Sequence, residues 1–312
     1  MGAIMMHPTI CVSGAATGLM TWFNSVVPSL FPFMVLTGLL TRSGALTLLN
    51  KKCKTLKGLN RLPITGIFAV LIGILCGYPM GIKTVSELKY ARQLSDEGAR
   101  YLYTFVNQPG PMFILGYALP LTGVKETAAA AWLASFYGAV LMTAVTSYLF
   151  FRIKSFFGGG KNTLDHRQEN VAVAHKQLSA NSNDAVKDVS LIPLMEETLA
   201  ASAETLTKIG GYMIIFSVIA ALLGELIPDY PLIRLIFCGL LEMTSGAALA
   251  KDVGPLSPYL ILFFISFGGL SVTAQSFTLG NLTSKNQMSY LFWKFFQAIL
   301  SMTLYMLFIR FV

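Results

Sequence analysis

The sequence predicts an all-α polytopic membrane protein, and three observations carry that prediction. Apolar residues make up 54% of the chain and charged residues only 12%, a composition typical of membrane proteins. Several apolar runs approach the roughly 20 residues that a transmembrane helix needs. The Lys and Arg side chains that give the net charge of +8 lie between these runs, as expected of basic cytoplasmic loops.

The same features exclude other classes of protein. The basic residues form no stripe interleaved with aromatics, so nucleic-acid binding is not expected. The four cysteines and three histidines lack the spacing of a metal site, and no cofactor is predicted. The sequence has no GxSxG, P-loop or HExxH motif. We therefore expect no enzyme and no catalytic residue.

The first transmembrane repeat is expected to span residues 1–154. It opens with Thr9–Leu40, long enough for one span that Pro28 and Pro32 would kink. The next segment, Lys51–Arg61, holds basic residues and no acids. By the positive-inside rule this loop is predicted to be cytoplasmic.

After this loop the sequence predicts a re-entrant hairpin. Pro63–Cys76 has only about 14 residues, too short to cross a bilayer. The chain would turn at Gly77–Gly81 and return through Ile82–Leu94. Tyr101–Leu121 is then a broken span, interrupted at Asn107–Pro111.

Thr127–Phe151 closes the first half as an ordinary span. Composition then changes between residues 155 and 198, where a run of glycines gives way to mixed polar and charged side chains. Such a segment buries too little apolar area to offset its chain entropy. We predict a cytoplasmic linker there.

The second repeat, residues 199–312, follows the same order of elements. A short apolar segment, Leu232–Leu241, is again expected to form a hairpin, here with its turn at Glu242–Gly246. Three crossings accompany it: Leu206–Leu226, Leu256–Leu282 with a break at Gly268–Gly269, and Met288–Phe308. Because three crossings per half is an odd number, two such units in tandem have opposite topology. This is the inverted-repeat plan of many secondary transporters.

The four breaks predict the binding site. Backbone groups freed at membrane depth cost several kcal/mol each unless they are satisfied, so breaks are expected where the chain lines a cavity. Interruptions at corresponding places in two halves point to a transporter binding site. The candidate substrate-binding residues come from these breaks: Gly77, Tyr78, Pro79, Gly81, Lys83, Asn107, Gln108, Pro109, Thr244, Ser245, Gly268, Gly269, Ser271 and Gln275.

Two ionisable residues stand out among the breaks. We expect Lys83 to be the only Lys or Arg close to any of the breaks. It is either the counter-charge to an anionic substrate or a lysine whose side chain snorkels to the membrane interface. Glu242 interrupts an apolar hairpin. It is a candidate for ion coupling, as a proton carrier or Na⁺ ligand, with a helix cap or a structural salt bridge as the alternative.

The uncharged polar residues leave alternatives open as well. The amides of Asn107 and Gln108 could bind a ligand or satisfy the freed backbone, or both. Ser271, Thr273 and Gln275 recur at alternate positions, as an extended segment would place them on one side. Thr244 and Ser245 could bond within their own turn instead of meeting a ligand.

Several of these segments also carry a resemblance to a known family. They are GYPMGIKTVSELK, FVNQPGPMFILG, GGYMIIFSVI, LLEMTSG and FGGLSVTAQ. They resemble the YlbJ (SpoVV) family of sporulation integral membrane proteins and its nucleoside-recognition (Gate) domain relatives. The resemblance implies a fold like that of the concentrative nucleoside transporters, and a role in moving dipicolinate across a membrane of the developing spore. The family usually has a second Asn where this chain has Gln108.

We therefore predict a secondary transporter, in a bacterial cell membrane or a membrane of the spore-forming compartment. Its substrate would be small, polar and anionic, such as dipicolinate, with Na⁺ or H⁺ as the coupling ion. The alternatives are a carrier of nucleosides or other small metabolites, and a Gate-fold sensor or assembly factor that transports nothing. The expected partners are the substrate and the lipid bilayer, and the sequence leaves open whether the chain forms a homo-oligomer.

Overall fold

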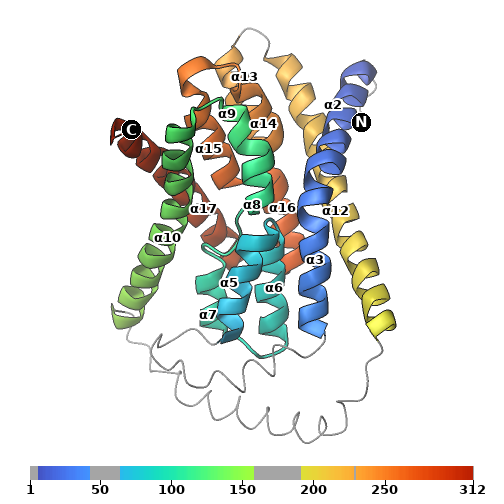
Figure 1. The fold of residues 1–312 in the computed structure, drawn as a ribbon, viewed down its shortest axis with the longest axis vertical. Helices are drawn as coiled ribbons and strands as arrows, with labels where there is room; N and C mark the ends of the chain where they lie inside the picture. Colours follow the sequence, from blue (N-terminus) through green and yellow to red (C-terminus); the bar gives the residue numbers. More distant parts are fainter. Residues whose placement is uncertain (1–5, 43–63, 158–190, 228–229, 312) are drawn as a thin grey trace, which may run out of the picture.

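The computed structural model describes residues 6–42, 64–157, 191–227 and 230–311, and every regular element in these ranges is helical (Figure 1). Five helical runs are long and apolar enough to cross a membrane: Pro8–Leu40, Glu126–Ile153, Ile192–Glu225, Gly254–Gly280 and Ser284–Phe311. The predicted all-α, multi-pass membrane protein is confirmed. The basic loop Lys51–Arg61 and residues 158–190 of the predicted linker lie outside the described residues.

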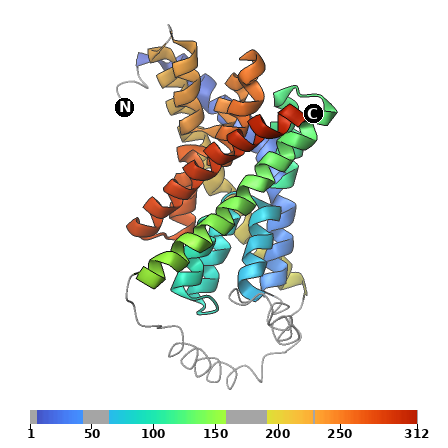
Figure 2. The same ribbon diagram turned by 90° about the vertical axis from the view of Figure 1, so that its left-hand side faces the viewer.

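Two long helical runs pack together along one side of the molecule (Figures 1 and 2). The first consists of α2 (Pro8–Thr21), a π-helical turn η1 (Trp22–Val26) and α3 (Val27–Arg42). The turn precedes Pro28 and Pro32, which lack the N–H groups that a regular helix needs. The second run is α12 (Leu191–Leu226).

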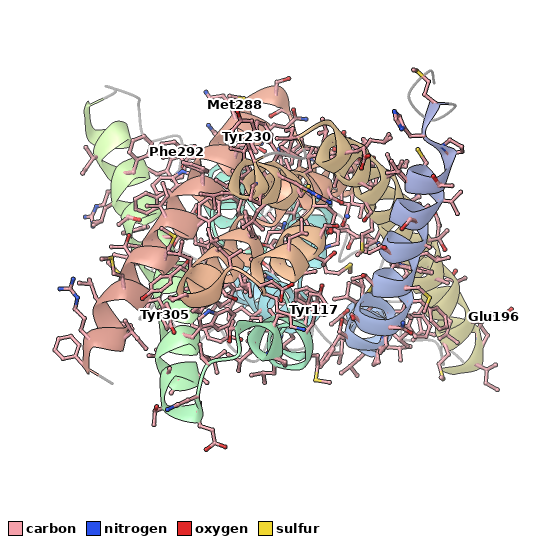
Figure 3. The ribbon with its side chains drawn as sticks, turned by 90° about the horizontal axis from the view of Figure 1, so that it is seen from above. Tyr117, Glu196, Tyr230, Met288, Phe292 and Tyr305 are labelled. Carbon is pink, nitrogen blue, oxygen red and sulfur yellow. The ribbon has the colours of Figure 1, made fainter. Side chains whose placement is uncertain are left out.

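The opposite side is formed by α10 (Glu126–Phe157) and α17 (Ser284–Phe308), which run side by side in Figure 2. A short turn, η4 (Ile309–Phe311), follows α17. On α17, Met288 and Phe292 lie on the outside of the bundle, where 62% of Phe292 is exposed (Figure 3). Large exposed apolar side chains of this kind are expected on a surface that faces lipid.

Two helical hairpins lie between these sides. The first joins α5 (Ile64–Cys76) to α6 (Met80–Tyr90), and the second joins α13 (Pro231–Leu241) to α14 (Met243–Ala250). They come from opposite ends of the molecule in Figure 1. A Cβ atom on Gly81 would lie 3.0 Å from Cα of Gly73, and one on Gly246 would lie 2.1 Å from Cα of Gly239. The arms of each hairpin therefore meet at a pair of glycines.

The two predicted broken spans differ in the length of their breaks. The first contains α7 (Asp96–Leu102), a non-helical stretch that ends at Gly110, and a helical run of α8 (Pro111–Phe113), η2 (Ile114–Ala118) and α9 (Leu119–Thr122). Gly110 is extended, with φ −69° and ψ 154°, because Pro111 disfavours a helical residue before it. The helical run Pro111–Thr122 is by itself too short to cross a membrane.

The second break is a single residue. After the short turn η3 (Gly254–Leu256), α15 (Ser257–Phe267) and α16 (Gly269–Gly280) are separated only by Gly268, whose φ is +87°. Side chains rarely adopt this left-handed conformation, so glycine is the residue suited to the position. All four predicted interruptions thus lie at helix ends.

Candidate functional site

Tyr78, at the tip of the first hairpin, joins that hairpin to the break between α15 and α16. Its hydroxyl donates hydrogen bonds of 3.1 Å to the carbonyl oxygens of both Ile265 and Ser266. These carbonyls belong to the last turn of α15, whose groups have no partner within the helix. A Cβ on Gly268 would lie 3.2 Å from the Tyr78 hydroxyl, so the aromatic ring packs directly on the break.

Glycines bring the other two interruptions to the same place. Gly77 has a φ of +80°, and a Cβ on it would lie only 2.5 Å from the backbone nitrogen of Gly110. A Cβ on Gly269 would lie 3.1 Å from the backbone nitrogen of Met243, at the tip of the second hairpin. The four interruptions, which are far apart in sequence, therefore meet in the interior.

A cavity of about 30 Å³ lies where they meet. That is room for about two water molecules, and too little for an aromatic dicarboxylate. Its lining comes from three of the interruptions, from α16 after the fourth, and from the long helical runs α2–η1–α3 and α12: Val26, Ser29, Leu30, Tyr78, Pro109, Gly110, Phe113, Ile209, Met213, Glu242, Met243, Val272 and Gln275. Binding of a larger ligand requires movement of these walls.

Glu242 caps the N-terminus of α14 with its carboxylate. Its Oε1 accepts a bond of 3.2 Å from the backbone N–H of Thr244, and its Oε2 accepts one of 2.7 Å from that of Ser245. The hydroxyl of Thr244 also donates to Oε2. The predicted site residues Thr244 and Ser245 thus hold the carboxylate in place. The coupling role of Glu242 remains a prediction.

The other helices that start at the interruptions have no side-chain cap among the described residues. They are α6 after Pro79, the run Pro111–Thr122 after Gly110, and α16 after Gly268. The first N–H groups of a helix carry partial positive charge and have no partner within the helix. The cavity is therefore bordered by one helix N-terminus that holds a carboxylate and three that no side chain caps.

A buried lysine that the sequence analysis missed lies beside the first break. Lys294, in the middle of α17, is fully buried. Its Nζ donates to the carbonyl oxygen of Asn107 at 3.0 Å and to Oε1 of Gln108 and Gln297 at 3.3 Å and 3.4 Å. The expectation that Lys83 is the only cation near a break is therefore wrong. The signal was present, because an ionisable residue inside a predicted span is a site candidate by default.

The amides at the first break are bound within the protein. Gln108 and Gln297 form a reciprocal pair, with N···O distances of 2.8 Å and 2.7 Å. Nδ2 of Asn107 donates to the hydroxyls of Ser276 and Tyr290, at 2.8 Å and 2.9 Å. Oδ1 of Asn107 is buried and accepts no hydrogen bond from any described residue.

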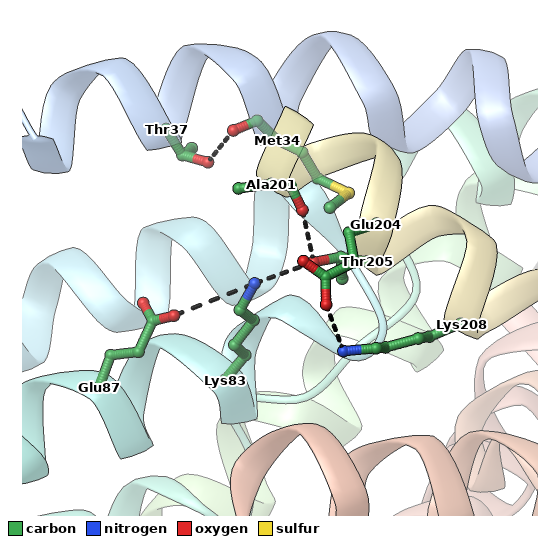
Figure 4. Close-up of polar contacts among 8 residues, drawn as sticks. All are labelled: Met34, Thr37, Lys83, Glu87, Ala201, Glu204, Thr205 and Lys208. Atoms are coloured by element: carbon green, nitrogen blue, oxygen red, sulfur yellow. Dashed lines mark hydrogen bonds and ion pairs between the residues drawn. The ribbon is translucent and has the colours of Figure 1, made fainter. Parts of the chain in front are cut away.

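Lys83 lies outside the cavity lining, on the first turn of α6 (Figure 4). Its Nζ donates to Oγ1 of Thr205 on α12 at 3.0 Å and lies 4.0 Å from Oε1 of Glu87, and 22% of its side chain is exposed. Gly81 has a packing role instead, since a Cβ there would lie 2.5 Å from the carbonyl oxygen of Val106.

The expectation of an extended segment at Ser271, Thr273 and Gln275 is wrong, because all three lie in α16. Gln275 Nε2 donates to Oγ of Ser271, one helical turn away, at 3.2 Å. The hydroxyl of Thr273 donates back to the carbonyl of Gly269 at 2.9 Å. Alternation of polar residues therefore did not reflect a strand, and of the three only Gln275 lines the cavity.

Fold and site together define a multi-pass α-helical membrane protein whose interrupted helices enclose a central cavity. Over 300 residues the chain is 27% identical to the sporulation integral membrane protein YlbJ of Bacillus subtilis (strain 168). The matched region covers 87% of this chain and 71% of the relative. This similarity supports the assignment of the chain to the YlbJ family. No family profile matches it, and no solved structure does.

Proposed function

We propose that this protein is a secondary transporter that moves a small, polar, anionic substrate such as dipicolinate during sporulation. The observation that carries the proposal is the meeting of four helix N-termini at one cavity inside a membrane protein. Each N-terminus is equivalent to about half an elementary positive charge. The carboxylate of Glu242 already binds at one of them, and a substrate carboxylate would find the same kind of donors at the other three.

The arrangement of the helices supports two inverted repeats, each with a re-entrant hairpin. In both halves a long helical run precedes a hairpin, an interrupted pair of helices and a second long helix. Corresponding elements pack on each other, α2 on α12 and α10 on α17. In transporters built from inverted repeats, movement of one part against another exposes a central site to each side in turn.

The charge near the cavity also suits an anion. A dianion at membrane depth is far too costly without a compensating positive charge. Nζ of Lys294 lies 4.9 Å from the centroid of the Tyr78 ring, and Tyr78 also lines the cavity. A protonated Lys294 would supply that positive charge from behind the cavity wall formed by Tyr78.

A second candidate is a carrier of neutral polar metabolites, such as nucleosides. One observation favours it: the described lining residues include the carboxylate of Glu242 but no Lys or Arg. A neutral ring with hydroxyl groups would bond to the side chains of Ser29 and Gln275 without needing a counter-charge.

Flux into proteoliposomes tests both candidates. We expect saturable uptake of labelled dipicolinate that unlabelled dipicolinate inhibits and nucleosides do not. The control is Gly77→Val, because a side chain at this position both collides with Gly110 and opposes a φ of +80°. Uptake of nucleosides alone would favour the second candidate. Binding of dipicolinate without any flux would instead indicate a sensor.

A further inference from the structure

We propose that the ammonium group of Lys294 is a resident cation of the transport site and takes the place of a bound metal ion, so that transport requires no Na⁺. The inference deepens the proposed function, on which it rests. It concerns a side chain that is tethered to α17 and therefore cannot leave with the substrate.

The geometry around Lys294 is that of a cation site. Three oxygens, from Asn107, Gln108 and Gln297, accept from Nζ at 3.0 to 3.4 Å. The ring of Tyr78 lies on another side, with its centroid 4.9 Å away. Three N–H groups and three oxygen acceptors satisfy an ammonium completely, and an aromatic face adds to its stabilisation.

The orientation of the two glutamine amides is fixed by other bonds. Gln108 Nε2 donates to the carbonyl oxygen of Phe105 at 2.8 Å and to Oε1 of Gln297, while Gln297 Nε2 donates to Oε1 of Gln108. Both amide oxygens are therefore turned toward Lys294. The three hydrogen-bonding partners offer only acceptors, which match the three N–H donors of an ammonium better than the two of a neutral amine.

No negatively charged group of the described residues contacts Nζ. Among the described residues no carboxylate lies within 4.0 Å of Nζ, and Tyr78 is the only titratable side chain found in contact with it. Tyr290 is one step further away, bonded to the amide of Asn107. The ammonium thus interacts with dipoles alone, and its positive charge is not cancelled by a neighbouring acid.

The position is the one that a coupling ion would occupy. Unwound carbonyl groups at a break in a transmembrane helix are the usual ligands of Na⁺ in transporters with broken helices. Here the carbonyl of Asn107, at the end of the first half of such a break, is bound by Lys294 instead. An ammonium group at this point uses the oxygens that a metal ion would need.

Thermal unfolding in detergent tests the site without any substrate. We expect the melting temperature of the wild-type protein to be the same in NaCl and in choline chloride of equal ionic strength. Lys294→Ala should leave a space that ethylammonium fills, with a saturable rise of about 3 °C over choline. Lys294→Met fills that space without charge and should not respond. Lys208→Ala, which removes an exposed lysine paired with Glu204, is the matched control.

In proteoliposomes we expect wild-type uptake to be unchanged when Na⁺ is replaced by choline, and uptake by Lys294→Met to be at least tenfold lower. A saturable, Na⁺-specific stabilisation of the wild-type protein would overturn the inference. So would a Lys294→Met variant whose melting temperature and uptake equal those of the wild-type protein. If Lys294→Ala cannot be purified in choline, recovery of monodisperse protein in ethylammonium is the equivalent positive result. Should no substrate be transported, the proposed function fails while the melting experiment still decides the role of Lys294.

Discussion

Replacement of Gly73 by alanine tests whether close backbone packing holds the first break in position. A Cβ on Gly73 would lie 2.0 Å from the carbonyl oxygen of Val106. Because real Cβ contacts are essentially never under 3.0 Å, the two segments must separate by about 1 Å. The obstructing atom belongs to the backbone, so no change of rotamer can relieve the conflict.

The magnitude follows from two opposing terms. Overpacking of this kind costs up to about 3 kcal/mol, and the better helix propensity of alanine offsets about 1 kcal/mol. The net loss of about 2 kcal/mol corresponds to a fall of roughly 4 to 8 °C in melting temperature. Uptake should fall as well, since Asn107, whose carbonyl binds Lys294, directly follows the displaced Val106.

The assay is thermal unfolding of the purified protein, with Gly211→Ala as the matched control. Gly211 also lies in the interior of a helix, but a Cβ there would have no atom within 4 Å. The control should be neutral or about 0.5 to 1 kcal/mol more stable. Equal melting temperatures for the two variants would refute the argument that Gly73 is needed for close approach.

Four further predictions concern single side chains and topology. Tyr78→Phe should cost about 1 to 3 kcal/mol, because two helix-end carbonyls lose their donor, and a melting temperature equal to that of the wild type would contradict this. Lys83→Ala should change dicarboxylate affinity less than twofold in a binding assay, since its ammonium contacts α12 and not the cavity; a tenfold loss would show that it reaches the substrate. Glu242→Gln should lower stability by about 1 kcal/mol through loss of a charged cap and, because it removes an ionisable group, should alter the pH dependence of uptake. Cysteines at Arg152 and Tyr230 should be labelled from opposite faces of the membrane; labelling from the same face would rule out the inverted topology.

The sequence was sufficient to predict the class of protein and where its helices are interrupted. Both follow from local chemistry. Apolar length decides which segments can enter a membrane, Pro109 and Pro111 restrict the backbone, and Gly77 and Gly268 allow the left-handed conformation that other residues rarely adopt. These constraints act within a few residues. For that reason the expected breaks and the observed helix ends agree, although the first break proved longer than the second.

The sequence did not reveal what each polar residue binds. Glu242 was compatible with a cap and with an ion site, and only the position of its carboxylate against the α14 backbone showed that it caps. The alternation of Ser271, Thr273 and Gln275 suggested an extended segment, but all three lie in the helix α16.

The environment of Lys294 is the clearest example of a property that only the tertiary structure determines. In the sequence it is one cation among aromatic residues in a span of ordinary length. Its partners Asn107 and Gln108 are 187 and 186 positions away. Whether a lysine in an apolar helix snorkels to the interface or stays inside depends on whether oxygens lie within reach of its ammonium, and that depends on how distant segments fold against it.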